Sequence, residues 1–142
     1  MLKKTILIVV IAGLVLFGLI QLVPYGKDHT NPPIVAEPKW DSPATRELAK
    51  RACFDCQSSE VFWPWYSNVA PPAWMIARDV EEARAEFSFS DWKTGLVRPE
   101  KVARVIRERT MPPGKYLLMH PTARLTNAEV EQLAQGLLKS LQ

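Results

Sequence analysis

The sequence is organised around Cys53-Phe54-Asp55-Cys56-Gln57, with Trp63-Pro64-Trp65-Tyr66-Ser67-Asn68 close behind. Cys53 and Cys56 are the only two cysteines of the chain. A Ser-Pro pair that suits the start of a helix comes before them, and apolar residues then recur at helical spacing. The pattern predicts a helix over about 43–54 that brings both thiols to roughly one side of its C-terminal end.

A Cys-x-x-Cys pair followed at once by His is the attachment signature of c-type haem. In that motif each thiol bonds a haem vinyl group and the His binds iron. Here Gln57 stands in the place of the His. An amide oxygen is a poor iron ligand beside an imidazole nitrogen or a thioether sulfur. The sequence therefore carries most of a haem motif and lacks its iron ligand.

Composition is that of an ordinary globular chain, with 47% hydrophobic and 23% charged residues. The formal net charge is +3, and Lys3 and Lys4 supply two of the positive charges. The remainder is near neutral, which gives no electrostatic footprint for nucleic acid. No Gly-rich phosphate loop and no Ser, His and Asp arrangement indicates hydrolysis, so we expect no enzyme activity.

Residues 5–23 carry no charge, and this length of 19 residues is close to the ~20 that cross a bilayer as a helix. A cleaved signal peptide is the alternative, but its apolar region usually spans about 7–15 residues and ends in a small-x-small site. We therefore predict a signal-anchor transmembrane helix over residues 1–23. Lys3 and Lys4 favour a cytoplasmic N-terminus. The protein would then be a single-pass protein of the inner membrane with its globular domain in the periplasm.

Prolines predict an extended linker over residues 24–39, because the residue before each proline is biased away from helix. His29 lies there as an exposed polar residue or, alternatively, a haem or metal ligand. Residues 40–142 are predicted to form one small all-α domain, with later helices from about 72 to 86, from Pro99, and over 127–141. In the first of these, Arg84 is assigned to the solvated face.

Three aromatic side chains, Trp63, Trp65 and Tyr66, fall within four positions of a loop. They could wall a flat apolar cofactor or fill the core of a small domain, and residue type leaves both interpretations open.

Two residues of the C-terminal half are candidate iron ligands. Met111 stands before Pro112-Pro113, which end a helix and fix its position, although a Met is more often core filler. His120 lies in a loop between that turn and a capping box that starts at Thr126. The alternative for His120 is a hydrogen bond to a loop carbonyl.

Several stretches together resemble the small membrane-anchored bacterial haem-binding domain proteins, which are related in plan to cytochrome c. The stretches are HTNPP at 29–33, EPKWDSPATRELAKRACFDC at 37–56, WPWYSNVAPPAW at 63–74, and the FSDW, MPP and YLLMHPTARLT segments further on. The resemblance implies a cytochrome-c-like helical domain whose first and last helices pack together. It implies covalent haem at Cys53 and Cys56, with Met111 or His120 as the second axial ligand. The family's proximal His has no counterpart, since Gln57 occupies its place.

The resemblance implies a membrane-anchored, periplasmic c-type haem-binding protein that transfers electrons to or from a redox partner protein. One alternative is a haem-less structural or partner-binding module with a Cys53–Cys56 disulfide. A thiol–disulfide enzyme is a further alternative, but the βαβ pattern expected around its cysteines is absent.

Overall fold

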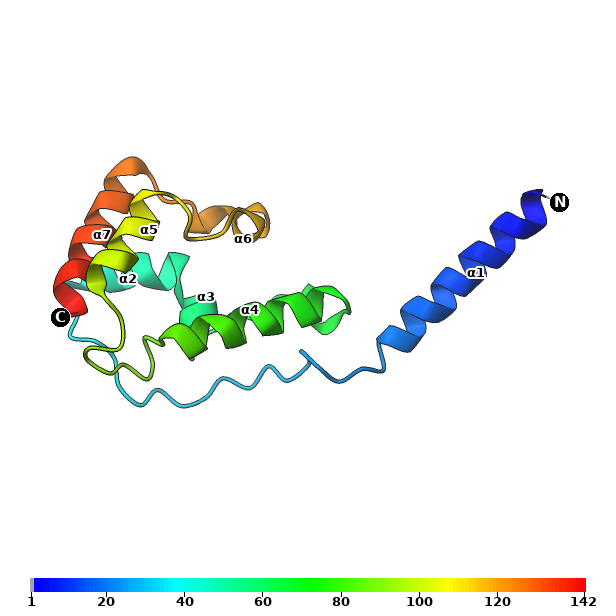
Figure 1. Cartoon of the computed structure of the whole chain (residues 1–142), viewed down its shortest axis with the longest axis horizontal. Coiled ribbons are helices and arrows are strands. Elements are labelled where there is room, and N and C mark those ends of the chain that lie inside the picture. Colours follow the sequence, from blue (N-terminus) through cyan, green and yellow to red (C-terminus); the bar gives the residue numbers. More distant parts are fainter. Residues whose placement is uncertain (1) are drawn as a thin grey trace. The chain divides into compact units, whose positions relative to one another are not determined.

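The computed structural model describes residues 2–142, which form seven α-helices and no β-strand (Figure 1). The helices are α1 (Leu2–Ile20), α2 (Pro43–Ala52), α3 (Phe54–Gln57), α4 (Pro72–Glu86), α5 (Pro99–Arg107), α6 (Gly114–Met119) and α7 (Asn127–Ser140). Two short 3-10 helices, η1 (Trp65–Asn68) and η2 (Pro121–Ala123), complete the described elements. The predicted all-α class is confirmed.

The chain forms two compact units. The first unit holds residues up to 30 together with 63–79, and the second holds 31–62 together with 80–142. α1 and η1 belong to the first unit, whereas α2, α3, α5, α6 and α7 belong to the second. The domain boundaries expected at residues 23 and 39 follow composition rather than contacts, and they stay a prediction.

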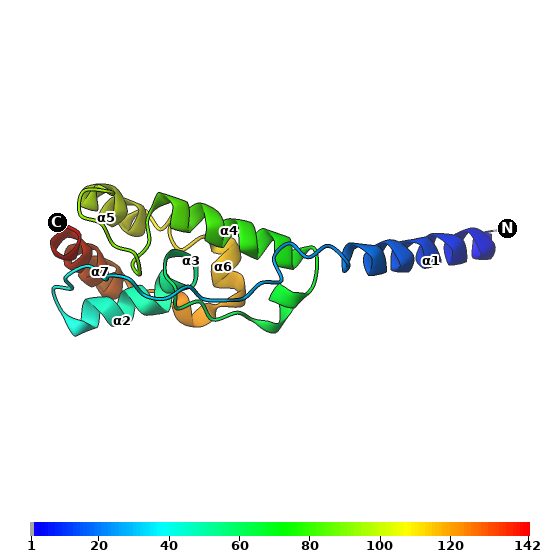
Figure 2. The ribbon, with the colours of Figure 1, turned by 90° about the horizontal axis from the view of Figure 1, so that it is seen from below.

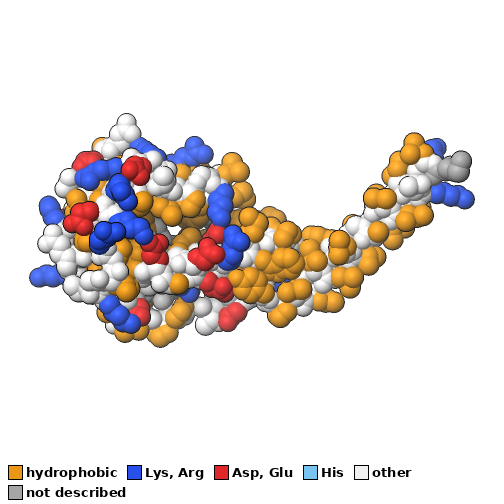
Figure 3. Space-filling model, in the orientation of Figure 1, with side chains coloured by type: hydrophobic (Ala, Val, Ile, Leu, Met, Phe, Trp, Pro, Cys, Tyr) orange, Lys and Arg blue, Asp and Glu red, His pale blue; other side chains and the backbone are white. Residues whose placement is uncertain are grey.

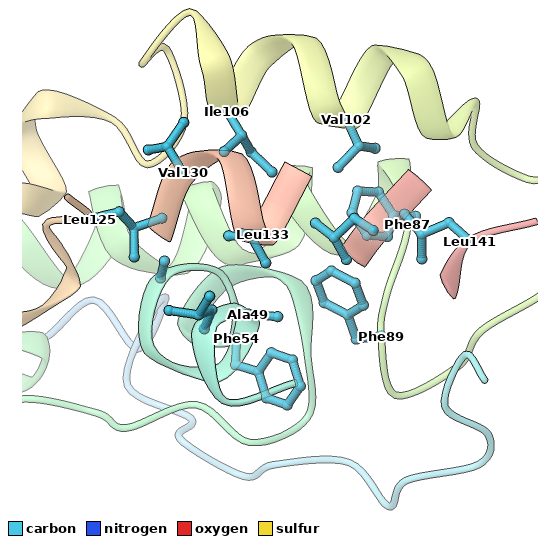
Figure 4. Packing of buried hydrophobic residues seen from close by; sticks show 13 residues of the cluster. Ala49, Phe54, Phe87, Phe89, Val102, Ile106, Leu125, Val130, Leu133 and Leu141 are labelled. Atoms are coloured by element: carbon cyan, nitrogen blue, oxygen red, sulfur yellow. The ribbon is translucent and has the colours of Figure 1, made fainter. Parts of the chain in front are cut away.

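α2, α5 and α7 pack around the hydrophobic core of the second unit (Figure 2). Ala49 of α2, Ile106 of α5 and Leu133 of α7 are almost fully buried there. Figure 4 shows these side chains converging with Phe54 and Phe89, whose ring centroids are 5.4 Å apart. The predicted packing of the helix before the cysteines against the last helix is thus confirmed.

The helix starts follow the capping residues of the sequence. The Ser42 hydroxyl accepts from the Thr45 amide at 3.2 Å, and Pro43 takes the first helical position of α2. At α7, Thr126 and Glu129 form a reciprocal capping box with hydrogen bonds of 3.2 and 2.7 Å. Local side-chain chemistry therefore sets both starts.

α2 and α7 approach closely because Gly136 lacks a side chain. A Cβ at Gly136 would lie 2.1 Å from Oγ1 of the buried Thr45. We expect Gly136→Ala to lower the free energy of unfolding by about 1–3 kcal/mol, the usual cost of overpacking a core. Urea unfolding of the wild type, Gly136→Ala and the double variant with Thr45→Ala measures this. A double variant no more stable than Gly136→Ala would contradict the assigned clash.

Two predicted elements next to the cysteines and His120 differ in the structure. The helix before the cysteines ends at Ala52, and Cys53 leaves helical geometry with φ −125°. This break turns Phe54 into the core, where it is 1% exposed, and α3 then carries Cys56. The segment before His120, predicted as loop, contains α6. Its six residues are too few for hydrophobic periodicity to reveal. Pro112 and Pro113, which predict the end of a helix, come directly before its first turn.

α1 is long and apolar enough to cross a membrane. Its mean hydropathy is 2.3 over 18 residues, and none of its residues is buried. Figure 3 shows its apolar side chains. Lys3 and Lys4 lie in its first turn. Between α1 and α2 the described chain has no helix, as predicted for the linker. Within this segment, Ala36 forms an isolated β-bridge with Asp91.

Candidate functional site

Cys53 and Cys56 lie one turn apart, and the Cys56 amide donates to the Cys53 carbonyl at 3.2 Å. Both side chains are half-buried thiols. Burial, with a smaller contribution from Cys56, raises the pKa of the Cys53 thiol to about 12. Cys53 is therefore neutral at physiological pH and is a poor candidate for a reactive thiolate.

Asp55, between the two cysteines, joins α3 to α6. The Tyr116 hydroxyl donates to Asp55 Oδ2 at 2.7 Å, and the Phe62 amide donates to Asp55 Oδ1 at 3.0 Å. Burial and then the bond to Asp55 raise the pKa of Tyr116, so its hydroxyl remains a donor. Sequence reasoning missed Tyr116, because nothing in its local pattern indicates a partner 61 residues away.

His120 packs directly on Tyr116. The two rings are stacked with centroids 4.1 Å apart and an angle of 14° between their planes. His120 Nδ1 lies 3.1 Å from the Tyr116 carbonyl oxygen. A proton on Nδ1 that donates to this oxygen makes Nε2 the basic nitrogen, which is the usual arrangement of a metal-binding His. The expected alternative, a carbonyl hydrogen bond, is thus present and is compatible with iron binding through Nε2.

His29 is held differently from the exposed linker residue that the sequence predicts. It is half-buried in the first unit and stacks on Trp63, with centroids 4.6 Å apart and an interplanar angle of 13°. Here Nε2 is the nitrogen that faces a carbonyl, that of Ser67 at 3.2 Å. The stacking partner lies 34 positions further along the chain, so local sequence could not reveal it.

The three loop aromatics lie in the first unit. Trp65 is 76% exposed, whereas Trp63 and Tyr66 are half-buried. The indole nitrogens of Trp63 and Trp74 are covered by protein and have no hydrogen-bond partner among the described residues. A nitrogen that bonds a haem propionate would be exposed in a structure without haem. These two nitrogens are covered, so a propionate could reach them only after a rearrangement. A haem-lining role for Trp63, Trp65 and Tyr66 stays a prediction.

Met111 is 49% exposed and follows the end of α5, where its amide donates to the Val105 carbonyl at 3.2 Å. It lines a hollow of about 320 Å³ in the second unit with Leu117, Leu125 and Val130 among its neighbours. A thioether beside an apolar hollow suits a large cofactor better than a bare ion. Residues 2–142 contain no cluster of three or more His, Cys, Asp or Glu side chains that could hold a metal ion.

Comparison with known families gives one match. Residues 15–139 match the family described as the haem-binding domain. The chain belongs to the haem-binding domain family. No curated protein and no solved structure matches it. Haem is therefore the cofactor, which disfavours the haem-less alternative of the sequence analysis.

The side chains of this haem-binding domain fit the group chemically. An imidazole and a thioether are both natural axial ligands of haem iron, and two thiols one turn apart suit two vinyl groups. His120 and both cysteines are linked within the second unit through Asp55 and Tyr116. If haem binds at these residues, His120 would hold the iron while Cys53 and Cys56 lie at the porphyrin edge.

Arg84 corrects another expectation from the sequence. Rather than lying on a solvated face, it is half-buried, and its Nε and Nη2 donate to the Ser58 carbonyl at 3.0 and 2.7 Å. Burial lowers the pKa of Arg84, and the nearby Cys56 opposes that shift.

We expect Tyr116→Phe to lower the free energy of unfolding by about 1.5 kcal/mol, the usual loss when a hydrogen bond to a charged group is removed. The variant keeps the ring that stacks on His120 and removes only the donor to Asp55. Urea unfolding followed by circular dichroism measures the change.

Asp55→Asn is the matched control, because it removes the charge and keeps an oxygen that accepts the Tyr116 proton. Equal stability of wild type and Tyr116→Phe would show that the bond between α3 and α6 contributes nothing.

Proposed function

We propose that this haem-binding domain protein is a membrane-anchored electron-transfer protein whose haem lies in the second unit, against α3 and α6. One observation carries the site assignment. The segment with the two cysteines and the segment with His120 are joined by the Tyr116–Asp55 hydrogen bond and the Tyr116–His120 stack. Residues that are far apart in sequence and suited to one cofactor are thus brought together.

When bound, haem supplies an iron that gains and loses one electron. The chain's own residues hold and orient it. His120 would hold the iron through Nε2, since its Nδ1 faces the Tyr116 carbonyl. Tyr116 fixes the plane of the imidazole by stacking, and Asp55 fixes Tyr116. Cys53 and Cys56 would tether the haem, and Met111 would be a further iron ligand.

The anchor is α1. Its length and apolar composition suit a bilayer span, and Lys3 and Lys4 at its start favour a cytoplasmic N-terminus. The haem-binding part would then face the periplasm of a cell with two membranes. A partner protein in that compartment would deliver or accept the electron.

The test uses membranes that contain the full chain. We expect a haem spectrum that dithionite reduces and an oxidant restores. We also expect the protein to remain in the membrane pellet after carbonate washing. A pyridine haemochrome then distinguishes covalent haem from haem that acid acetone extracts. Haem that is bound but not reversibly reduced would contradict electron transfer, and release by carbonate would contradict the anchor.

A further inference from the structure

The first unit contains a second uncharged segment besides residues 5–23. Residues 63–77, WPWYSNVAPPAWMIA, include no Asp, Glu, Lys, Arg or His. Three tryptophans and one tyrosine fall within this stretch, which forms η1 and the first part of α4. Charged side chains are common over the second unit (Figure 3). Exposed large apolar side chains in such a segment mark an interaction site.

Hydrogen bonds tie this segment to the end of α1. The Gln21 amide group pairs with the Ala70 peptide, because its Nε2 donates to Ala70 O at 3.1 Å and its Oε1 accepts from Ala70 N at 2.8 Å. Gln21 follows α1 directly. Both polar atoms of the Gln21 side chain are thereby bonded to a residue 49 positions further along the chain.

Gly26 makes a second close contact in the same unit. Its φ is 77°, and a Cβ there would lie 2.5 Å from the Ala73 carbonyl oxygen. Only glycine fits this backbone conformation and this approach to α4. The residues that follow α1 are therefore packed against the uncharged segment rather than leading away from it.

Large apolar side chains of both parts are exposed. Trp65 is 76% and Met75 52% exposed in the uncharged segment, and Leu22 is 77% and Tyr25 42% exposed after α1. Trp and Tyr are the residues enriched where a membrane meets water, since one end of each ring system is apolar and the other polar. The interfacial layer adds only about 5–8 Å to each side of the hydrocarbon core, so contacts made next to the end of a span lie within it.

We propose that η1 and the start of α4 lie in the interfacial layer of the membrane that α1 spans, with Trp65 and Met75 inserted among the lipids. This inference rests on the proposed membrane anchoring by α1. Continuity argues for lipid over another occupant, because the uncharged segment is bonded to the residue that follows the span. The protein is then held to the membrane at two places, which limits the swing of its first unit.

The experiment uses the full chain, with its haem, in phosphatidylcholine vesicles whose acyl chains carry bromine near the headgroup. Bromine quenches a tryptophan only at close range. α1 contains no tryptophan, so all quenching reports on residues outside the span. We expect tryptophan fluorescence to be lower in brominated than in plain vesicles, and Trp65→Phe to lose most of this lipid-dependent quenching. Trp92→Phe, in the second unit, is the matched control and should keep it.

Each result decides the inference. Flotation with the vesicles, together with equal quenching of wild type and Trp65→Phe or none in either, overturns the interfacial position and leaves the anchor standing. Failure to float overturns both. Trp65 fluorescence that responds to haem loading and not to bromine would place this side chain at the haem, which also overturns the proposal.

Discussion

Replacing Gln57 by His is expected to raise the covalent haem content of the protein several-fold. The substitution restores the Cys-x-x-Cys-His signature that attachment uses, and it supplies an imidazole next to the second cysteine. Gln57 ends α3, and its carbonyl accepts from the Phe89 amide at 2.7 Å. That bond involves only the main chain, so it survives a change of side chain. The side chain is half-buried, so the substitution need not place a ring inside the core.

Haem staining of denatured protein on a gel measures this effect, because only covalent haem remains. Gln57→Asn is the matched control, since it changes the side chain while keeping an amide. The natural sequence and Gln57→Asn should stain weakly and equally, whereas Gln57→His should stain strongly. Equal staining of Gln57→His and the natural sequence would show that position 57 does not limit attachment.

Sequence could predict the parts of this fold that short-range chemistry determines. Ser42 and Thr126 cap their helices as expected, and the prolines at 72 and 99 mark helix starts. The predicted end of α5 at Met111-Pro112-Pro113 was wrong, because the chain leaves helix after Arg107 and turns through Arg109 at a φ of 59°. The Arg109 guanidinium donates to Leu125 O at 2.6 Å, a contact 16 residues away that stabilises this turn.

The candidate site shows the same division. The cysteine spacing and the two candidate ligands are visible in the sequence, since each is a matter of residue type. Tyr116 is not, because its role depends on which residue of α3 it meets in the folded chain. The environment of His29 is likewise set by Trp63 and Ser67. The ring and the carbonyl that contact His29 lie at least 34 residues away, so local sequence does not reveal them.

His120→Ala is expected to shift or abolish the Soret band of the haem form, whereas His29→Ala should leave the band almost unchanged. With Gln57 at the usual position of the proximal His, His120 supplies the one imidazole of the second unit, beside thioethers such as that of Met111. Removing the imidazole leaves only these weaker ligands. His120 has its Nδ1 at a carbonyl, whereas His29 has its Nε2 at one.

His29→Ala is a close control because the two substitutions cost similar contacts. Each removes an imidazole stacked nearly parallel on one aromatic ring, at 4.6 Å for His29 and 4.1 Å for His120. General destabilisation should therefore affect both variants alike, and circular dichroism measures it. Added imidazole should restore the band only in His120→Ala, since the small molecule can occupy the vacated axial position. An unchanged Soret band in His120→Ala, together with a shifted one in His29→Ala, would make His29 the iron ligand and move the haem to the first unit.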